Sequence, residues 1–167
     1  AVTIGIVGLT ALVLYKTAAM LSTRRAGFFA ALLYAVFSTT YIPKIIATTI
    51  EPVMLLPVAL QYWLWLCFER EGKRRLAFAS GAAFATACCF KYQAGMNLVI
   101  LLAYLGVARP MLLGWRPYLR NWRGFLPFLV GAAIPPAIML AYLWHAGALE
   151  GFLFWSLRGN ADYLRGG

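Results

Sequence analysis

Two charged side chains, Glu51 and Lys44, interrupt the long apolar stretch from Ser38 to Pro57 and are the first candidates for chemistry. A carboxylate that faces lipid carries a free-energy penalty of several kcal/mol, so Glu51 must lie at a membrane interface or in a protected polar cavity. In such a place a carboxylate can accept a proton or hold a cation, and a lysine can bind phosphate. We therefore expect Glu51 to belong to a functional site.

The composition places these charges in a membrane protein. Hydrophobic residues make up 63% of the 167 residues and charged residues 12%, which is too apolar for an ordinary soluble domain. The net charge of +10 would suit nucleic acid, but the fifteen lysines and arginines fall in short clusters between apolar runs. We expect membrane lipids as partners, and no nucleic acid.

Charged and polar breaks divide the chain into an all-α, polytopic transmembrane helical bundle of about six spans in one domain, residues 1–167. The predicted spans are about 1–21, 26–42, 52–68, 76–90, 92–108 and 125–144, followed by a tail at 145–167. The fourth and fifth divide one apolar run of about two membrane widths, which is too long for a single helix. Residues 109–123 predict an amphipathic segment at the headgroups, and Pro135-Pro136 predicts a kink in the last span.

Positive charge gives the bundle an orientation. Eleven of the fifteen lysines and arginines fall in three breaks that alternate assignment puts on one side, which the positive-inside rule makes cytoplasmic. A set of charged and polar side chains then gathers at the outer face, although its members lie far apart in the sequence. They are Lys44, Glu51, Lys91, Arg158, Asn160, Asp162 and Tyr163.

Each of the three leading candidates also has a purely structural interpretation. Lys44 can be an interfacial anchor whose amine reaches the headgroups. Glu51 can be an acid that the dipole favours at a helix N-terminus. Lys91 can be an anchor of the same kind, but this role is less natural for it because it lies between two apolar spans beside Gln93.

Four sequence features in order resemble a known family. They are RRAGFFAALLYAVFSTTY at residues 24–41, Glu51-Pro52 opening a span, the EREGKRR loop at 69–75, and LAFASGAAFATACCFKYQAG at 76–95. Together they resemble the lipid-linked-sugar glycosyltransferases of the GT-C superfamily. The closer resemblance is to the bacterial branch related to protein O-mannosyltransferases and lipid A aminoarabinose transferases. It covers most of the chain and depends on the order and spacing of the motifs.

This resemblance implies an enzyme of the bacterial cytoplasmic (inner) membrane that acts at the outer face. It would transfer a sugar, with inversion, from a polyprenyl-phosphate donor to a lipid, glycan or protein acceptor. Glu51 is similar to the family's second outer-loop acid, which organises the site and can contact a divalent cation, the one candidate metal. Lys91 would face the donor phosphate. The other substrate-binding candidates are Lys44, Tyr92, Gln93, Arg158, Asn160 and Tyr163.

The chain also departs from this family. Its members carry a first helix and a first outer loop whose acid serves as the catalytic base, and nothing before Ala1 corresponds to them. We therefore expect a piece of a larger protein that is inactive on its own.

Two other classes remain open from the sequence. In a transporter, Glu51 and Lys91 would form a coupling pair; against this, the charged groups collect at one face and no internal repeat is visible. In a structural membrane subunit, both side chains would point separately to the headgroups.

Overall fold

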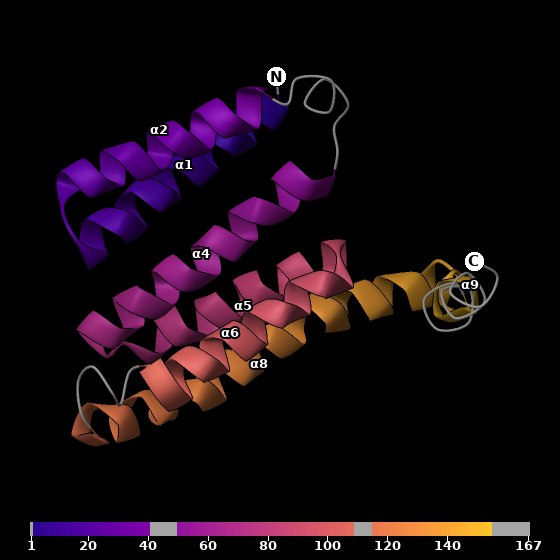
Figure 1. Cartoon of the computed structure of the whole chain (residues 1–167). Coiled ribbons are helices and arrows are strands. Elements are labelled where there is room, and N and C mark those ends of the chain that lie inside the picture. The colour runs from indigo at the N-terminus through magenta and orange to yellow at the C-terminus, as the bar shows by residue number, and fades with distance from the viewer. Residues whose placement is uncertain (1, 41–49, 109–114, 155–167) are drawn as a thin grey trace, which may run out of the picture.

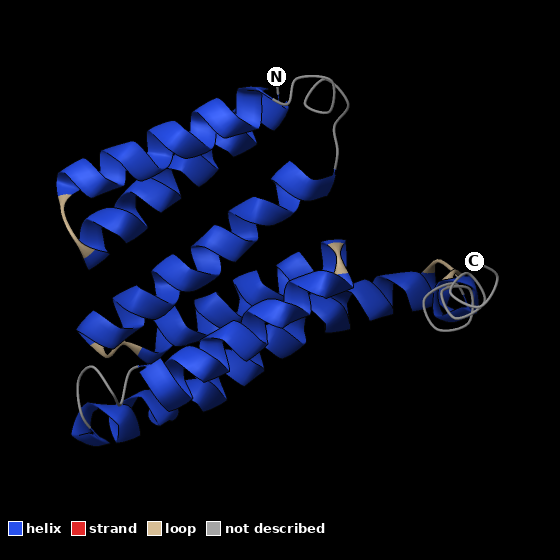
Figure 2. Ribbon diagram, viewed as in Figure 1, coloured by secondary structure: helices blue, strands red, loops and turns tan. Residues whose placement is uncertain are grey.

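The computed structural model describes residues 2–40, 50–108 and 115–154, with side chains over 2–38, 53–107 and 123–154. Within these ranges every regular element is a helix (Figure 2), which confirms the all-α class. The elements are α1 (Val2–Leu21), α2 (Arg24–Thr40), α4 (Ile50–Glu71), α5 (Arg74–Phe90), η1 (Tyr92–Gly95), α6 (Met96–Ala103), η2 (Tyr104–Ala108), α8 (Trp115–His145) and α9 (Leu149–Leu153).

Two tight turns produce two antiparallel helix pairs, α1 with α2 and α4 with α5 (Figure 1). In the first turn the Thr23 hydroxyl accepts a hydrogen bond from the Ala26 N–H at 3.2 Å, which caps the start of α2. In the second, Gly72 adopts a left-handed conformation with φ 70°, as glycine commonly does after a helix. Its N–H bonds to the Phe68 carbonyl at 2.8 Å. These two short turns thus place α2 beside α1 and α5 beside α4.

The described basic segments between the helices lie at one end of the bundle. Both turns are at this end, and so is the start of α8 (Figure 1). The Arg70 guanidinium donates to the Met20 carbonyl, which joins the ends of α4 and α1 there. The first turn of α4 and η1 lie at the opposite end (Figure 1). We call the two ends the basic end and the α4-start end.

Glycines bring α5 and α8 into backbone contact. A Cβ atom on Gly81 would collide with the Phe128 carbonyl oxygen, and one on Gly131 would collide with the Phe78 carbonyl oxygen. Two other small residues of α5, Ala77 and Ala85, are buried at four-residue spacing from Gly81. Small residues at this spacing are typical of closely packed helices in membranes, where dispersion contacts replace the hydrophobic effect.

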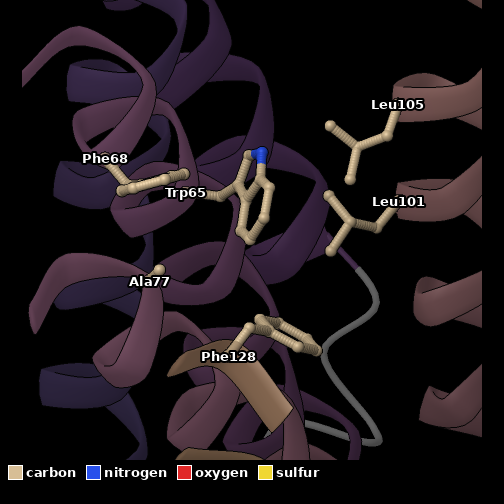
Figure 3. Packing of buried hydrophobic residues seen from close by; sticks show 6 residues of the cluster. All are labelled: Trp65, Phe68, Ala77, Leu101, Leu105 and Phe128. Atoms are coloured by element: carbon tan, nitrogen blue, oxygen red, sulfur yellow. The ribbon is translucent and has the colours of Figure 1, made fainter. Parts of the chain in front are cut away.

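A hydrophobic cluster around Trp65 connects α5 and α8 to α4, α6 and η2. Trp65 is 1% exposed and lies between Phe68, Leu101 and Leu105, with Phe128 below its ring (Figure 3). The Trp65 and Phe128 rings meet edge to face, with their centroids 5.8 Å apart. Edge-to-face packing stabilises such a pair by more than the burial of its apolar surface alone.

The structure adds detail to two predicted segments. The range of the fifth span, 92–108, is helical throughout but irregular, since a 3₁₀ turn (η1), two turns of α-helix (α6) and a π-helical turn (η2) follow one another. The interfacial segment predicted at residues 109–123 is, from Trp115 onward, continuous with the last span. Together they form α8, whose 31 residues extend for about 46 Å. Pro135 and Pro136 lie inside α8, and the kink expected there stays a prediction.

The outside of the bundle is apolar and several buried positions are polar. Large apolar side chains are exposed along α1, α2, α6 and α8, while Thr10, Gln61 and Ser80 are at most 1% exposed. The Ser80 hydroxyl donates to the Gln61 carbonyl at 2.7 Å and so links α5 to α4. This distribution favours lipid around the helices. By length and composition, α1 and residues Arg123–His145 could each cross a membrane, which supports two of the six predicted spans.

Replacing Gln61 with methionine tests the buried polar interior. Neither end of the Gln61 side-chain amide has a hydrogen-bond partner among the described residues. A buried unpartnered amide costs about 1–3 kcal/mol, and methionine has nearly the same volume. We therefore expect Gln61→Met to raise the thermal unfolding temperature in detergent, whereas Gln61→Ala lowers it by leaving a cavity. Equal losses in both variants would contradict this expectation.

Candidate functional site

Lys91 occupies the junction between α5 and η1. Its backbone is extended, with φ −155° and ψ 116°, and therefore ends α5 and begins the 3₁₀ turn. Its N–H bonds to the Ala87 carbonyl at 3.1 Å, and its own carbonyl accepts the Ala94 N–H at 2.9 Å. The Lys91 side chain is half-buried. Its backbone is thus fixed by both flanking helical segments.

The two neighbours of Lys91 lie on the surface. Tyr92 is 74% exposed and Gln93 is also exposed, whereas Ala94 is buried beneath them. The buried alanine anchors the turn, which presents the tyrosine and the amide outward. Both side chains are therefore accessible to a ligand that approaches from the α4-start end.

A hydrogen-bonded pair attaches this turn to α4. The Tyr62 hydroxyl donates to Asn97 Oδ1 at 2.8 Å, and Asn97 Nδ2 donates to the Ala94 carbonyl at 2.9 Å. Tyr62 belongs to α4 and Asn97 to the first turn of α6. The pair therefore connects the helix that begins at Ile50 to the turn that follows Lys91. The sequence analysis missed this positioning role for both residues, and the available signal was one amide, Asn97, at the start of an apolar helix.

Removing the Tyr62 hydroxyl tests this attachment. We expect Tyr62→Phe to lower the free energy of unfolding by about 0.6–1.5 kcal/mol, because Asn97 Oδ1 loses its donor in an apolar surrounding. Tyr15→Phe is the matched control, as Tyr15 lies on α1, away from Asn97. The measurement is thermal unfolding of both variants in the same detergent. Equal stability of the two variants would contradict the role assigned to the hydroxyl.

Glu51 lies in the first turn of α4, with Pro52 next to it. A proline suits a first helical turn, where its missing N–H is not needed, and an acid there is favoured by the helix dipole. The backbone thus places Glu51 at the same end of the bundle as Lys91 (Figure 1). The Glu51 side chain lies outside the described residues. So do four other predicted site residues, Lys44, Arg158, Asn160 and Tyr163.

Two described hollows lie away from these residues. An apolar cavity of about 320 Å³ lies between α1, α4 and the α6–η2 segment, and Tyr62, Trp65 and Tyr104 are part of its lining. An open groove of about 600 Å³ lies between α5 and α8 at the basic end. Neither is lined by Lys91, Tyr92 or Gln93. No group of three or more potential metal ligands occurs among the described side chains, so the divalent cation at Glu51 stays a prediction.

Glu69, which the sequence analysis did not single out, organises the basic end. It accepts hydrogen bonds from Trp65 Nε1 at 3.0 Å and from the Tyr104 hydroxyl at 3.2 Å. It therefore joins α4 to η2 and holds the central tryptophan in place. Its four-residue spacing from Trp65 on α4 was the only sequence signal for the first of these bonds.

Comparison with known proteins confirms the resemblance noted from the motifs. The profile of the family described as dolichyl-phosphate-mannose-protein mannosyltransferase matches residues 2–144. Searches among curated proteins and among solved structures give no significant match. The matched range includes the first turn of α4, the Lys91 turn and nearly all of α8. The chain therefore belongs to the dolichyl-phosphate-mannose-protein mannosyltransferase family.

Proposed function

We propose that the protein transfers a sugar from a polyprenyl-phosphate donor to a lipid, glycan or protein acceptor at the outer face of a bacterial cytoplasmic membrane. The family is one of membrane glycosyltransferases, and the match over residues 2–144 is the observation that carries this proposal. The family description names a lipid-phosphate sugar as donor. Such a donor requires a site that is open both to lipid and to the aqueous acceptor.

The distribution of charge supports placing the active face at the α4-start end. Both helix turns and the start of α8, with their lysines and arginines, lie at the basic end (Figure 1). The positive-inside rule puts that end in the cytoplasm. Glu51 and Lys91 then face the outside of the cell, in the bundle of about six spans expected from the sequence.

In the proposed site Lys91 binds the phosphate of the donor. During transfer the acceptor oxygen bonds to the anomeric carbon, while the bond from that carbon to the phosphate oxygen breaks. Negative charge grows on the departing polyprenyl phosphate, and a fixed ammonium group stabilises it more than it stabilises the donor. Attack opposite the phosphate inverts the anomeric carbon. The backbone hydrogen bonds on either side of Lys91 support this role, because they fix the position of the backbone from which the side chain extends.

Glu51 is proposed to organise the site from the first turn of α4, either by orienting the acceptor or by holding a divalent cation near the donor phosphate. Tyr92 and Gln93 lie beside Lys91 and are proposed to bind sugar hydroxyls. Lys44, Arg158, Asn160 and Tyr163 are proposed to complete the same outer cavity. We assign the base that deprotonates the acceptor to none of the described side chains.

The proposal is tested by transfer of radiolabelled sugar in membranes that contain the protein as its gene encodes it. The donors are a panel of sugars linked to polyprenyl phosphate, each with and without a chelator of divalent cations. We expect one donor to support transfer and its product to have the opposite anomeric configuration. If no donor supports transfer while the protein is present and folded, the enzymatic proposal is wrong and a transporter becomes the better hypothesis.

A further inference from the structure

The open groove between α5 and α8 combines three positive charges with an apolar floor. Arg74 and Arg75 come from the start of α5 and Arg123 comes from α8, 48 positions later in the sequence. Phe78, Leu126, Pro127 and Val130 form the rest of its described lining. All three arginines are exposed, and the lining includes no acidic side chain. The described lining of the groove therefore carries a net positive charge at its mouth.

Helix periodicity separates the charged and apolar parts of this groove. Phe78 follows Arg74 by four residues, and Leu126 and Val130 follow Arg123 by three and seven. These spacings keep the side chains on one face of each helix. The apolar residues extend about 10 Å from the charges along the helix axes. From Phe78 onward α5 and α8 are in backbone contact, with Gly131 against the Phe78 carbonyl and Gly81 against the Phe128 carbonyl.

One acid, Glu71, lies close to these arginines but is paired with a lysine. Its carboxylate is 2.6 Å from the Lys73 Nζ. The hydrogen bond and the charge of Lys73 hold the pKa of this carboxyl below its ordinary value, and the charge of Arg75 lowers it less. Glu71 therefore stays ionised at neutral pH and paired with the lysine, outside the lining of the groove.

We propose that this groove binds one anionic diacyl phospholipid, with the phosphate on Arg74, Arg75 and Arg123 and the acyl chains along Phe78, Leu126 and Val130. Guanidinium groups suit phosphate because their paired N–H donors match two of its oxygens. A basic pocket between helices at the cytoplasmic side is a typical position for such a headgroup. Charge complementarity selects an anionic lipid, and the apolar floor selects a lipid over a soluble phosphate. This proposal does not rest on glycosyl transfer.

The test measures lipid retention without any sugar donor. The protein is purified in nanodiscs of phosphatidylcholine, with or without phosphatidylglycerol, and the lipids that it retains are counted by native mass spectrometry. We expect one phosphatidylglycerol to be retained in preference to phosphatidylcholine. Arg75→Gln/Arg123→Gln should weaken that preference roughly fivefold for each arginine removed. Val130→Asn keeps the arginines, and it should weaken retention by placing an amide against the acyl chains.

The matched control is Arg24→Gln/Arg25→Gln, which removes the same charge from the start of α2 at the same end of the bundle. It should retain phosphatidylglycerol as the unchanged protein does. If this control loses as much preference for phosphatidylglycerol as the groove variant does, the protein attracts anionic lipid through its overall charge, and the proposed site is wrong. Glycerol phosphate, which has no acyl chains, should not compete; effective competition would identify a site for soluble phosphate and overturn the lipid proposal. Each variant is first checked for unchanged helix content.

Discussion

A methyl group added at Gly81 is expected to lower the free energy of unfolding by about 3 kcal/mol, the largest stability effect that we predict. The new carbon would overlap the Phe128 carbonyl oxygen and approach the Ala132 nitrogen to 3.0 Å. These are backbone atoms of α8, so no side chain can rotate out of the way. The two helices must separate, and the separation also loosens Phe128 against Trp65.

The experiment compares Gly81→Ala with Gly8→Ala. Gly8 lies in the middle of α1, and a Cβ atom there meets nothing within 4 Å. Because alanine favours a helix over glycine by about 1 kcal/mol, the control should be neutral or slightly stabilising. Thermal unfolding in detergent gives both values. Similar unfolding temperatures in the two variants would show that α5 and α8 are not in backbone contact.

The second large effect is on transfer rather than stability. Glu51→Gln and Lys91→Ala should each reduce the rate of transfer about 100-fold or more, the first by removing the carboxylate that organises the site and the second by removing the ammonium group that stabilises the departing phosphate. Lys91→Arg should retain part of the activity, because it keeps a positive charge near the donor phosphate. The assay is single-turnover sugar transfer with saturating donor, which separates loss of chemistry from loss of binding.

Lys73→Gln is the control for these variants. It also removes a positive charge, but it lies at the basic end, in a surface pair with Glu71. We expect it to transfer sugar at the unchanged rate. Full activity of both Glu51→Gln and Lys91→Ala would show that these residues are interfacial anchors, and a transporter would then be the better hypothesis. The folded fraction of each variant is measured alongside, so that lost protein is not mistaken for lost chemistry.

Most helix boundaries could be predicted because they depend on local chemistry. Thr23 caps α2, Gly72 ends the turn after α4, and Pro52 lies in a first helical turn, as their types favour. The polar group around Lys91 correctly marked the break after α5. Each of these signals lies within a few residues of the feature that it produces.

The remaining features depend on contacts between distant residues. The Tyr62–Asn97 bond joins residues 35 positions apart, and Gly81 lies against the Phe128 backbone, 47 positions later in the sequence. Neither pairing follows from a local pattern, because many polar and small residues occur in this chain. The arginine- and tryptophan-rich segment before Gly124 suits an interfacial helix and the start of a long helix equally well, so only the structure assigns it to α8.

The contact between α5 and α8 also has a mechanical consequence. Two backbones in direct contact leave no intervening side chains to rearrange, so these helices should move as a rigid body. In contrast, α1 meets α4 through long side chains, with the Lys16 amine 5.1 Å from the centre of the Trp63 ring and Arg70 on the Met20 carbonyl. The apolar cavity lies along the same boundary. Relative motion within the bundle is therefore expected between the α1–α2 pair and the rest of the described helices, along the boundary that holds this cavity.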